Sequence, residues 1–357
     1  MIADNSSVYK KMYTKAVAEL DEGAAVTFVA SGEEALERTK RFDYDIVVID
    51  TEMAEPYAAR LMESIARNIL GAFLLVTARP SPGNAERFAE ALAKGAADCM
   101  TKPIYSSYNE NLDTIKEKME NIYKALCAAR DKKGRSTEGE VIKRKRAGKH
   151  DCFPPEVVLV AASTGGPLAL EKIFSELRED FPVPILAIQH MPPYFMPSLA
   201  QHLNQKSRLR VKVAERDETA VAGTVYIAPG GVHMKLDAKN KIHFDGSPPL
   251  NGVRPAADVL FESVAESFSG SRVLAVVLTG MGCDGEKGLA ALKEKRNCVC
   301  LAQSEGTCVV YGMPRAVVES GFADKVLDLE EIPAEIERFC FPLTGRAGGD
   351  GKAREKS

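Results

Sequence analysis

Long apolar runs, an export signal and a strong net charge are all absent from this 357-residue sequence. No apolar run approaches the roughly 18 residues that a membrane-spanning helix needs. The first residues, Met1 to Asn5, reach acidic and polar side chains at once, so we expect no signal peptide. The formal net charge is only −3, which gives no reason to expect nucleic-acid binding. We therefore expect a cytoplasmic protein that inserts into no membrane and binds no nucleic acid.

Paired metal-binding cysteines are missing as well. None of the eight cysteines forms a C-x-x-C pair, which argues against a zinc site. Without an export signal we interpret them as reduced thiols, and most simply as small buried apolar side chains. They are Cys99, Cys127, Cys152, Cys283, Cys298, Cys300, Cys308 and Cys340.

What the sequence does contain is an alternation of short apolar runs and helical patterns in both halves. In the first half, Ile46–Ile49 and Phe73–Val76 predict buried strands, and residues 33–40 and 84–94 predict helices. In the second half, strands are predicted at Val157–Ala162, Ile185–Gln189, Val225–Ala228, Val273–Thr279 and Val299–Ala302. This alternation is typical of parallel sheets covered by helices.

The length suits about two domains of roughly 150 residues each. We predict two doubly wound parallel-sheet α/β domains, over residues 1–128 and 154–343, joined by a charged linker over residues 129–153. Within it, residues 131–152 hold eight Lys or Arg and four Asp or Glu. The basic cluster Lys143–Arg146 could bind nucleic acid or anionic lipid, but nothing aromatic interleaves it, so we interpret it as a solvated hinge. Residues 344–357 are expected to form a disordered tail.

Four polar side chains follow predicted strand ends in the first domain: Asp4, Asp50, Thr77 and Lys102. In an open parallel sheet the carboxyl ends of the strands line the functional crevice. Two carboxylates can help to hold Mg²⁺, with water and phosphate completing its shell. A hydroxyl and an ammonium can hold phosphoryl oxygens. Each residue alone could be an ordinary polar group where a strand meets solvent, but the spacing of all four favours a phosphoryl site.

This half resembles the receiver domain of two-component response regulators, which implies a flavodoxin-like fold. The resemblance is carried by Ile2–Ser6, Asp45–Met53, Val76–Thr77, Lys94–Asp98 and Thr101–Pro103. It implies that Asp50 is the phosphoacceptor and that Asp4 and Asp50 bind Mg²⁺. It also implies that Thr77 and Lys102 sense the phosphoryl group. Asn5 stands where the family usually has a second acidic metal ligand.

A serine lies at a glycine-rich strand-to-helix turn in the second half, with Ser163 directly after the predicted strand. Glycines beside it let a substrate approach the backbone, and N–H groups at the start of a helix can stabilise an anion. Such turns also bind phosphates and dinucleotides, although the G-x-G-x-x-G spacing and a P-loop lysine are missing here. From the turn alone, a serine nucleophile and a nucleotide site at Gly165–Gly166 both stay open.

Two further strand ends in this half carry groups suited to acyl transfer. His190 precedes two prolines, which hold it stiffly, and Asp284 follows the strand Val273–Thr279 in a glycine-rich segment. His233 is a rival for the base, and any of these residues could be purely structural. Together with a serine, they could supply a base for the hydroxyl proton and a carboxylate that orients the imidazolium. The order Ser, His, Asp and the missing G-x-S-x-G elbow disfavour an ordinary α/β-hydrolase.

From about Val157 to Ile336 the chain closely resembles the catalytic domain of chemotaxis protein-glutamate methylesterases, which implies a Rossmann-like fold. The resemblance implies that Ser163 is the nucleophile, His190 the base and Asp284 the orienting carboxylate. The motifs, in the family's order, are Ala162–Gly166, the His190 segment, Ala228–Gly230, His233–Met234, Arg254–Pro255, Asp258–Phe261, Leu278–Gly285, Ala302–Gln303 and Gly312–Pro314.

Two neighbouring positions extend this resemblance and one departs from it. Thr164 and Met281 match positions near the family's oxyanion and substrate site. Cys283 stands where the family usually has Asn. A thiol nucleophile at Cys283 is disfavoured because the Ser163 turn matches the family and nothing else marks the thiol.

A receiver fused to this esterase is the architecture of the chemotaxis methylesterase. It implies hydrolysis of glutamate methyl esters, and deamidation of glutamines, on methyl-accepting chemotaxis receptors, with no cofactor for the esterase. A chemotaxis histidine kinase would phosphorylate Asp50, with Mg²⁺ in the receiver, and so uncover the esterase site. Two alternatives stay open: a catalytically silent scaffold that binds a partner, and a nucleotide-binding regulator.

Overall fold

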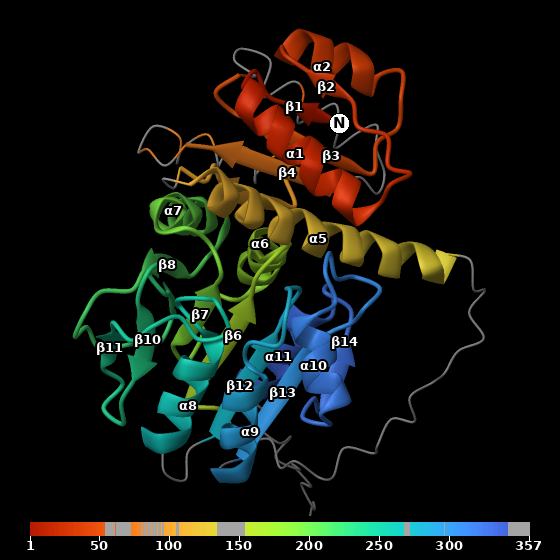
Figure 1. Cartoon of the computed structure of the whole chain (residues 1–357). Coiled ribbons are helices and arrows are strands. Elements are labelled where there is room, and N and C mark those ends of the chain that lie inside the picture. The colour runs from red at the N-terminus through yellow and green to blue at the C-terminus, as the bar shows by residue number, and fades with distance from the viewer. Residues whose placement is uncertain are drawn as a thin grey trace, which may run out of the picture.

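The computed structural model of the chain describes residues 1–53, 61, 73–79, 81, 84, 87, 91, 94, 96–104, 107–133, 154–267, 272–295 and 297–341. These residues form two α/β units, the first at the top of Figure 1 and the second below it. Helix α5 (Tyr108–Lys133) runs along the boundary between them (Figure 1). No helix within the described residues is both long and apolar enough to span a bilayer.

The first unit is built on a five-stranded sheet in the order β2-β1-β3-β4-β5, with every pair of neighbours parallel. Its strands are β1 (Ile2–Ala3), β2 (Phe28–Val29), β3 (Ile46–Asp50), β4 (Phe73–Ala78) and β5 (Asp98–Thr101). With α5, the helices of this unit include α1 (Ser7–Leu20) and α2 (Gly32–Thr39). The strand order is that of flavodoxin-like folds, so the expected fold class is confirmed.

Side-chain caps explain where two of these helices begin. The Ser6 hydroxyl accepts a hydrogen bond from the Tyr9 N–H at 3.5 Å, and the Ser31 hydroxyl accepts one from the Glu34 N–H at 3.2 Å. A serine in this position satisfies a backbone donor that has no partner inside the helix, which stabilises the helix by about 1 kcal/mol. The first cap fixes α1 directly after the strand that carries Asp4.

The second unit is built on a seven-stranded parallel sheet in the order β14-β13-β12-β6-β7-β9-β8, with a separate antiparallel hairpin of β10 and β11. Its strands are β6 (Val157–Ala162), β7 (Ile185–Gln189), β8 (Arg210–Val213), β9 (Thr224–Ile227), β10 (His233–Leu236), β11 (Ile242–Asp245), β12 (Arg272–Val277), β13 (Asn297–Gln303) and β14 (Lys325–Leu327). Its helices are α6 (Gly166–Glu176), α7 (Met196–Lys206), α8 (Ala257–Ser267), α9 (Glu286–Lys295), α10 (Met313–Glu319) and α11 (Ile332–Cys340), with a 3₁₀ turn, η1 (Pro193–Phe195).

Strand β6 is the centre of this second sheet and is buried along its whole length. On one face, Val158 and Val160 pack in the same apolar cluster as Ile173 of α6. On the other face, Leu159 packs in a cluster with Phe261 of α8. Burying an aliphatic or aromatic side chain of this kind contributes about 1.5–3 kcal/mol. The two clusters confirm a sheet covered by helices on both faces, as the continuous apolar run predicts.

The chain reverses direction across the sheet at β6. It first adds β7 on one side of β6, and later adds β12 on the other. In doubly wound sheets, such a switch point opens a crevice at the carboxyl ends of the strands, where ligands bind. The loops that follow β6, β7 and β12 therefore share one functional edge.

Most strands predicted from the sequence are present within a residue or two of the expected bounds, and the helix predicted at residues 33–40 corresponds to α2. Helix α5 continues past the predicted start of the linker to Lys133. Residues 134–153 of the predicted linker, the predicted tail 344–357 and most of the helix predicted at residues 84–94 lie outside the described residues.

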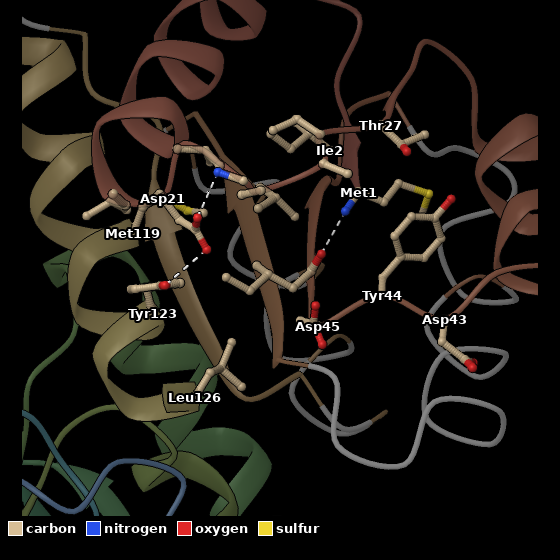
Figure 2. Close-up of a pocket in the computed structure, with 18 of the residues that line it drawn as sticks. Met1, Ile2, Asp21, Thr27, Asp43, Tyr44, Asp45, Met119, Tyr123 and Leu126 are labelled. Atoms are coloured by element: carbon tan, nitrogen blue, oxygen red, sulfur yellow. Dashed lines mark hydrogen bonds between the residues drawn. The ribbon is translucent and has the colours of Figure 1, made fainter. Parts of the chain in front are cut away.

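A pocket of about 490 Å³ opens at the amino ends of the strands of the first unit (Figure 2). The Met1 ammonium donates a hydrogen bond to the Ile46 carbonyl there, and burial lowers the pKa of this amino group to about 5. Asp50 lies at the other end of β3, about 13 Å from Ile46 at 3.3 Å per residue. The pocket is thus separate from the edge that carries the polar residues predicted to be functional.

Candidate active sites

The predicted nucleophile, base and carboxylate of the second unit all lie at its switch point. Ser163 directly follows β6, His190 directly follows β7, and Asp284 lies in the loop between β12 and α9. The His190 N–H donates a hydrogen bond to the carbonyl of Ala162 at 3.1 Å. The predicted base is therefore connected, through one backbone hydrogen bond, to the residue just before the serine.

His190 and Asp284 are in direct contact. The ring Nε2 of His190 lies 2.8 Å from the carboxylate Oδ2 of Asp284. Both side chains are nearly buried, at 10% and 3% exposed. A carboxylate at this distance selects the tautomer in which Nε2 carries the proton, so Nδ1 is the ring nitrogen left to accept a proton from a hydroxyl.

The Asp284 carboxylate is held by the first residues of α8. The N–H groups of Ala257 and Asp258 donate to it at 2.6 and 3.1 Å. Burial opposes the charge of Asp284, but the hydrogen bond and charge of His190, together with these two N–H groups, outweigh burial and lower its pKa. Asp284 therefore stays ionised, as a group that must stabilise an imidazolium requires.

Ser163 is held through its backbone and leaves its hydroxyl without a partner. Its N–H donates to the Thr279 carbonyl at 3.0 Å. A Cβ at Gly280 would lie 2.8 Å from the Ser163 Cβ, so only glycine lets the loop after β12 approach the serine this closely. Within the part of the chain that the structure describes, the Ser163 hydroxyl makes no hydrogen bond. The hydroxyl is thus placed at the switch point and is free to engage a base or a substrate.

The two predicted oxyanion positions flank the serine differently. Thr164 is buried, and its carbonyl accepts a hydrogen bond from the Thr279 hydroxyl at 2.9 Å. Met281 is half-buried and follows Gly280, which touches Ser163. Both residues therefore lie beside the predicted nucleophile.

His233, the rival base, is tied down by two backbone groups. It is fully buried, its Nδ1 accepts the Ala256 N–H at 3.1 Å, and its Nε2 lies 3.1 Å from the Pro248 carbonyl. With both ring nitrogens engaged, His233 has no free lone pair for a substrate proton. His190 is the histidine at this edge whose ring is paired with a carboxylate.

The predicted phosphoryl site of the first unit is also assembled at one edge. The Lys102 ammonium lies 2.6 Å from the Asp50 carboxylate and 2.7 Å from that of Asp4, and all three side chains are buried. Thr77 pairs in register with Asp50, and its hydroxyl donates to the Ile49 carbonyl at 3.4 Å. The structure therefore brings together the four residues that the strand-end pattern singled out.

The two carboxylates of this cluster are only partly neutralised by the one ammonium. Burial raises the pKa of Asp50 despite the hydrogen bond and charge of Lys102. Burial opposes the charge of Lys102, but its contacts with Asp4 and Asp50 outweigh burial and raise its pKa. One ammonium is therefore shared by two carboxylates, which leaves net negative charge at this edge.

The first unit contacts the nucleophile turn of the second. The Thr164 hydroxyl donates to the Asp98 carboxylate at 2.6 Å, and the Gly165 N–H donates to the Ala97 carbonyl at 3.0 Å. The Lys118 ammonium of α5 forms an ion pair with the same Asp98 oxygen. Val309 of the second unit packs against the apolar cluster of the first. These contacts cover the two residues that directly follow Ser163.

Sequence patterns did not reveal this contact. Asp98 lies in a stretch that supports the receiver resemblance, but its partner Thr164 is 66 residues away, and no local pattern connects the two.

Asp258 is a second residue of the site that the sequence pattern did not identify. It accepts the N–H groups of Gly285 and Gly288, both at 2.9 Å, and so fixes the loop that carries Asp284. Its place in a matched motif was the available signal.

Comparisons with known proteins agree on both units. Residues 158–336 match the family described as CheB methylesterase, and residues 1–111 match the response regulator receiver domain. The protein-glutamate methylesterase/protein-glutamine glutaminase 1 of Syntrophomonas wolfei is 37% identical over 352 residues, which cover 94% of this chain and 97% of the relative. The protein-glutamate methylesterase/protein-glutamine glutaminase of Thermotoga maritima is 35% identical over 346 residues, covering 94% of this chain and 96% of the relative.

A solved structure is also similar to the second unit. The crystal structure of the Thermotoga maritima CheB methylesterase catalytic domain is 43% identical and covers 52% of this chain and 98% of that chain, with a TM-score of 0.49.

Proposed function

The chain belongs to the CheB methylesterase family, with a receiver domain ahead of the esterase domain, and from this we propose that it hydrolyses glutamate methyl esters, and deamidates glutamines, on chemoreceptors. The proposed chemistry uses Ser163, His190 and Asp284, and phosphorylation of Asp50 controls it. The observation that carries the proposal is the buried hydrogen bond of 2.8 Å between His190 and Asp284, at the switch point where Ser163 leaves β6.

In the proposed reaction, the Ser163 oxygen attacks the carbonyl carbon of the ester while His190 takes the hydroxyl proton. The tetrahedral intermediate collapses, and His190 returns the proton to the leaving oxygen, which departs as methanol. A water molecule then attacks the acyl-enzyme, again with His190 as base, and releases glutamate and the free serine. A glutamine side chain follows the same steps and releases ammonia. Asp284 stabilises the imidazolium at each stage.

We propose that the receiver domain inhibits the esterase in the unphosphorylated chain. Support comes from the Asp98 carboxylate and the Ala97 carbonyl, which occupy the Thr164 hydroxyl and the Gly165 N–H. Donors next to the nucleophile are the groups that a substrate carbonyl or its oxyanion would need. While receiver oxygens hold these donors, they are not available to the substrate.

Strand β5 offers a short physical route from the phosphoryl site to this contact. It begins with Asp98, which binds Thr164, and it is followed directly by Lys102, which binds Asp50. A phosphoryl group on Asp50 changes the charge that Lys102 faces, and movement of Lys102 would pull on the strand that carries Asp98. The proposal therefore places the switch and the inhibitory contact at the two ends of one four-residue strand.

Mg²⁺ fits the acidic side of the phosphoryl site. Asp4 and Asp50 are buried carboxylates that share the single ammonium of Lys102, at 2.7 and 2.6 Å, so the site keeps an excess of negative charge. Asp4 and Asp50 would hold the ion, with water and phosphate as its other ligands. When bound, Mg²⁺ would neutralise part of the charge of the phosphoryl oxygens. The histidine kinase of the chemotaxis pathway is the proposed phosphodonor.

The test is methanol release from methylated receptor by a Ser163→Ala variant of the full chain. We expect the rate to fall at least about a thousand-fold, because the nucleophile is lost. Ser263→Ala is the matched control, since both serines are 9% exposed and Ser263 lies in α8, where its hydroxyl bonds to backbone groups. Unchanged methanol release by Ser163→Ala would rule out the serine mechanism, whereas no methanol release by the native chain would favour a silent scaffold.

A further inference from the structure

A buried glutamine connects the nucleophile to the base. Gln189 is the last residue of β7 and is fully buried. Its side-chain Nε2 donates to the Ser163 carbonyl at 2.8 Å and to the His190 carbonyl at 3.1 Å. One carboxamide group therefore contacts the backbone of both residues.

The position of Gln189 explains why a side chain is needed here. The β6–β7 ladder ends where Ala162 pairs with Gln189. The last backbone bond between the strands runs from the His190 N–H to the Ala162 carbonyl. Ser163 and His190 thus lie one residue past the ladder, where regular pairing no longer fixes their separation. The Gln189 carboxamide supplies the next cross-strand connection.

The turn after Ser163 is shaped to admit this carboxamide. An ideal Cβ at Gly166 would lie 2.0 Å from Gln189 Oε1 and 2.9 Å from the Ala162 Cβ. Only glycine leaves that space open. The Gly166 N–H also donates to the Ser163 carbonyl at 2.8 Å, so this carbonyl receives two donors.

Keeping the carboxamide has an energetic cost. Gln189 Oε1 is buried and accepts no hydrogen bond from any described residue. A buried acceptor without a partner destabilises the fold, whereas a methionine of similar length would fill the space without that cost. The donor function of Nε2 is the structural feature that offsets this cost.

We propose that Gln189 is a positioning residue that sets the distance between the Ser163 hydroxyl and the His190 ring. The inference rests on the proposed function, because it needs Ser163 and His190 to be the reacting pair. Without the two donor bonds, the residues past the ladder lose this side-chain connection, and a displacement of about 1 Å between reacting groups can cost about a hundred-fold in rate.

The test compares Gln189→Met and Gln189→Glu in the full chain by methanol release from methylated receptor. Gln189→Met should lower kcat about a hundred-fold with KM changed less than two-fold, because positioning acts on the chemical step. Ser263→Ala serves as the control for loss of a buried polar group. Its kcat should stay at the native value, and its thermal midpoint gives the scale for a purely structural effect.

Gln189→Glu provides a readout that packing alone would not move. A protonated glutamic acid has the shape of glutamine and one O–H donor, while its ionised form turns a repelling oxygen toward the two carbonyls. Burial favours the protonated form. We therefore expect Gln189→Glu to exceed Gln189→Met in kcat, and to lose activity with rising pH where the native chain does not.

The possible outcomes separate this inference from the proposed function. A native kcat in Gln189→Met, with Ser163→Ala inactive, would overturn the role of Gln189 alone. If Gln189→Met does not fold, the pH dependence of kcat in Gln189→Glu decides. A dependence parallel to that of the native chain would overturn the proposal. A loss of activity at alkaline pH in Gln189→Glu alone would support it. An active Ser163→Ala variant would instead remove the serine mechanism on which the inference rests.

Discussion

The two domains place their functional groups at the same kind of sheet edge but hold them by different means. In the receiver, Asp4 and Asp50 both pair with the Lys102 ammonium, and each also accepts one backbone N–H, from Ser6 and Glu52. In the esterase, Asp284 is held by backbone N–H groups of α8, and Ser163 by a backbone bond to Thr279. The arrangement of charged side chains in an ion-pair cluster changes when one of the charges is altered. The backbone N–H groups at the start of a helix are instead fixed in place by the fold. The difference suits a switch in one domain and a rigid catalyst in the other.

The largest expected effect is on the activity of the esterase domain, where exchanging one oxygen of Asp284 for nitrogen should strongly lower kcat. Asp284→Asn keeps the shape of the side chain but replaces a carboxylate oxygen facing His190 with a group that cannot stabilise an imidazolium. We expect kcat for methanol release to fall by about 10³–10⁴-fold. The thermal midpoint should fall as well, because the new NH₂ group faces the N–H of Ala257 or of Asp258 and cannot accept its hydrogen bond. The measurement is steady-state methanol release by the full chain.

A second His–Asp pair supplies the control for that experiment. Asp237 Oδ2 lies 2.9 Å from His243 Nε2 at the surface, where both side chains are more than a third exposed. Asp237→Asn removes the same kind of pairing in the turn between β10 and β11, which form a hairpin separate from the seven-stranded sheet. Equal losses in Asp237→Asn and Asp284→Asn would contradict a specific role for the pair at the switch point.

The contact between the domains is expected to set the basal rate. Asp98→Asn weakens a charge-assisted hydrogen bond to Thr164 and removes the ion pair with Lys118. Hydrogen bonds to charged groups contribute about 1.5–3 kcal/mol, so we expect methanol release without phosphodonor to rise about ten-fold. Asp43→Asn, at an exposed position, is the control. A basal rate that stays at the native level in Asp98→Asn would argue against inhibition through this contact.

In the receiver domain, removal of one charge should lower the stability of the fold. Lys102→Met leaves two buried carboxylates without their shared counter-charge, which should destabilise the receiver by about 3 kcal/mol. Millimolar Mg²⁺ should restore part of this loss, because a divalent cation can replace the ammonium between Asp4 and Asp50. Thermal denaturation with and without MgCl₂ measures both effects.

Lys124→Met is the matched control for the receiver, because Lys124 is 68% exposed on α5 and, among the described residues, forms an ion pair with Glu120 four residues earlier. Such surface pairs contribute about 0–1 kcal/mol. If Mg²⁺ stabilised both variants equally, or neither, the two carboxylates would not form the proposed cation site.

The sequence predicted the location of a side chain correctly where that location follows from sheet topology alone. Ser163, His190 and Asp50 each follow an apolar run, and parallel strands bring their carboxyl ends to one edge. The sequence did not predict contacts between elements that are connected by no sequence pattern. Asp98 meets Thr164 across a domain boundary, and the Gln189 side chain spans two strand ends that sequence can place only approximately.

The choice between His190 and His233 shows the same limit at one residue. Both histidines lie in motifs of the methylesterase resemblance. The residue pattern left both open as the base, and the resemblance implied His190. The structure separates them by the partners of their rings: a carboxylate for His190, and two backbone groups for His233. Ring partners depend on tertiary packing, which local sequence does not encode.

The smallest expected effect concerns Cys283, the exposed thiol next to Asp284, the proposed orienting carboxylate. Burial of its sulfur, and the charges of Glu286 and its other acidic neighbours, raise the pKa of Cys283, so at neutral pH it is a thiol rather than the thiolate that a nucleophile requires. Cys283→Ala should therefore keep kcat within about two-fold of the native value, since surface substitutions rarely change more. Alkylation of the native chain with iodoacetamide should be slow at pH 7 and faster above pH 9. A loss of activity in Cys283→Ala as large as that in Ser163→Ala would mean that the thiol, and not only the hydroxyl, takes part in the chemistry.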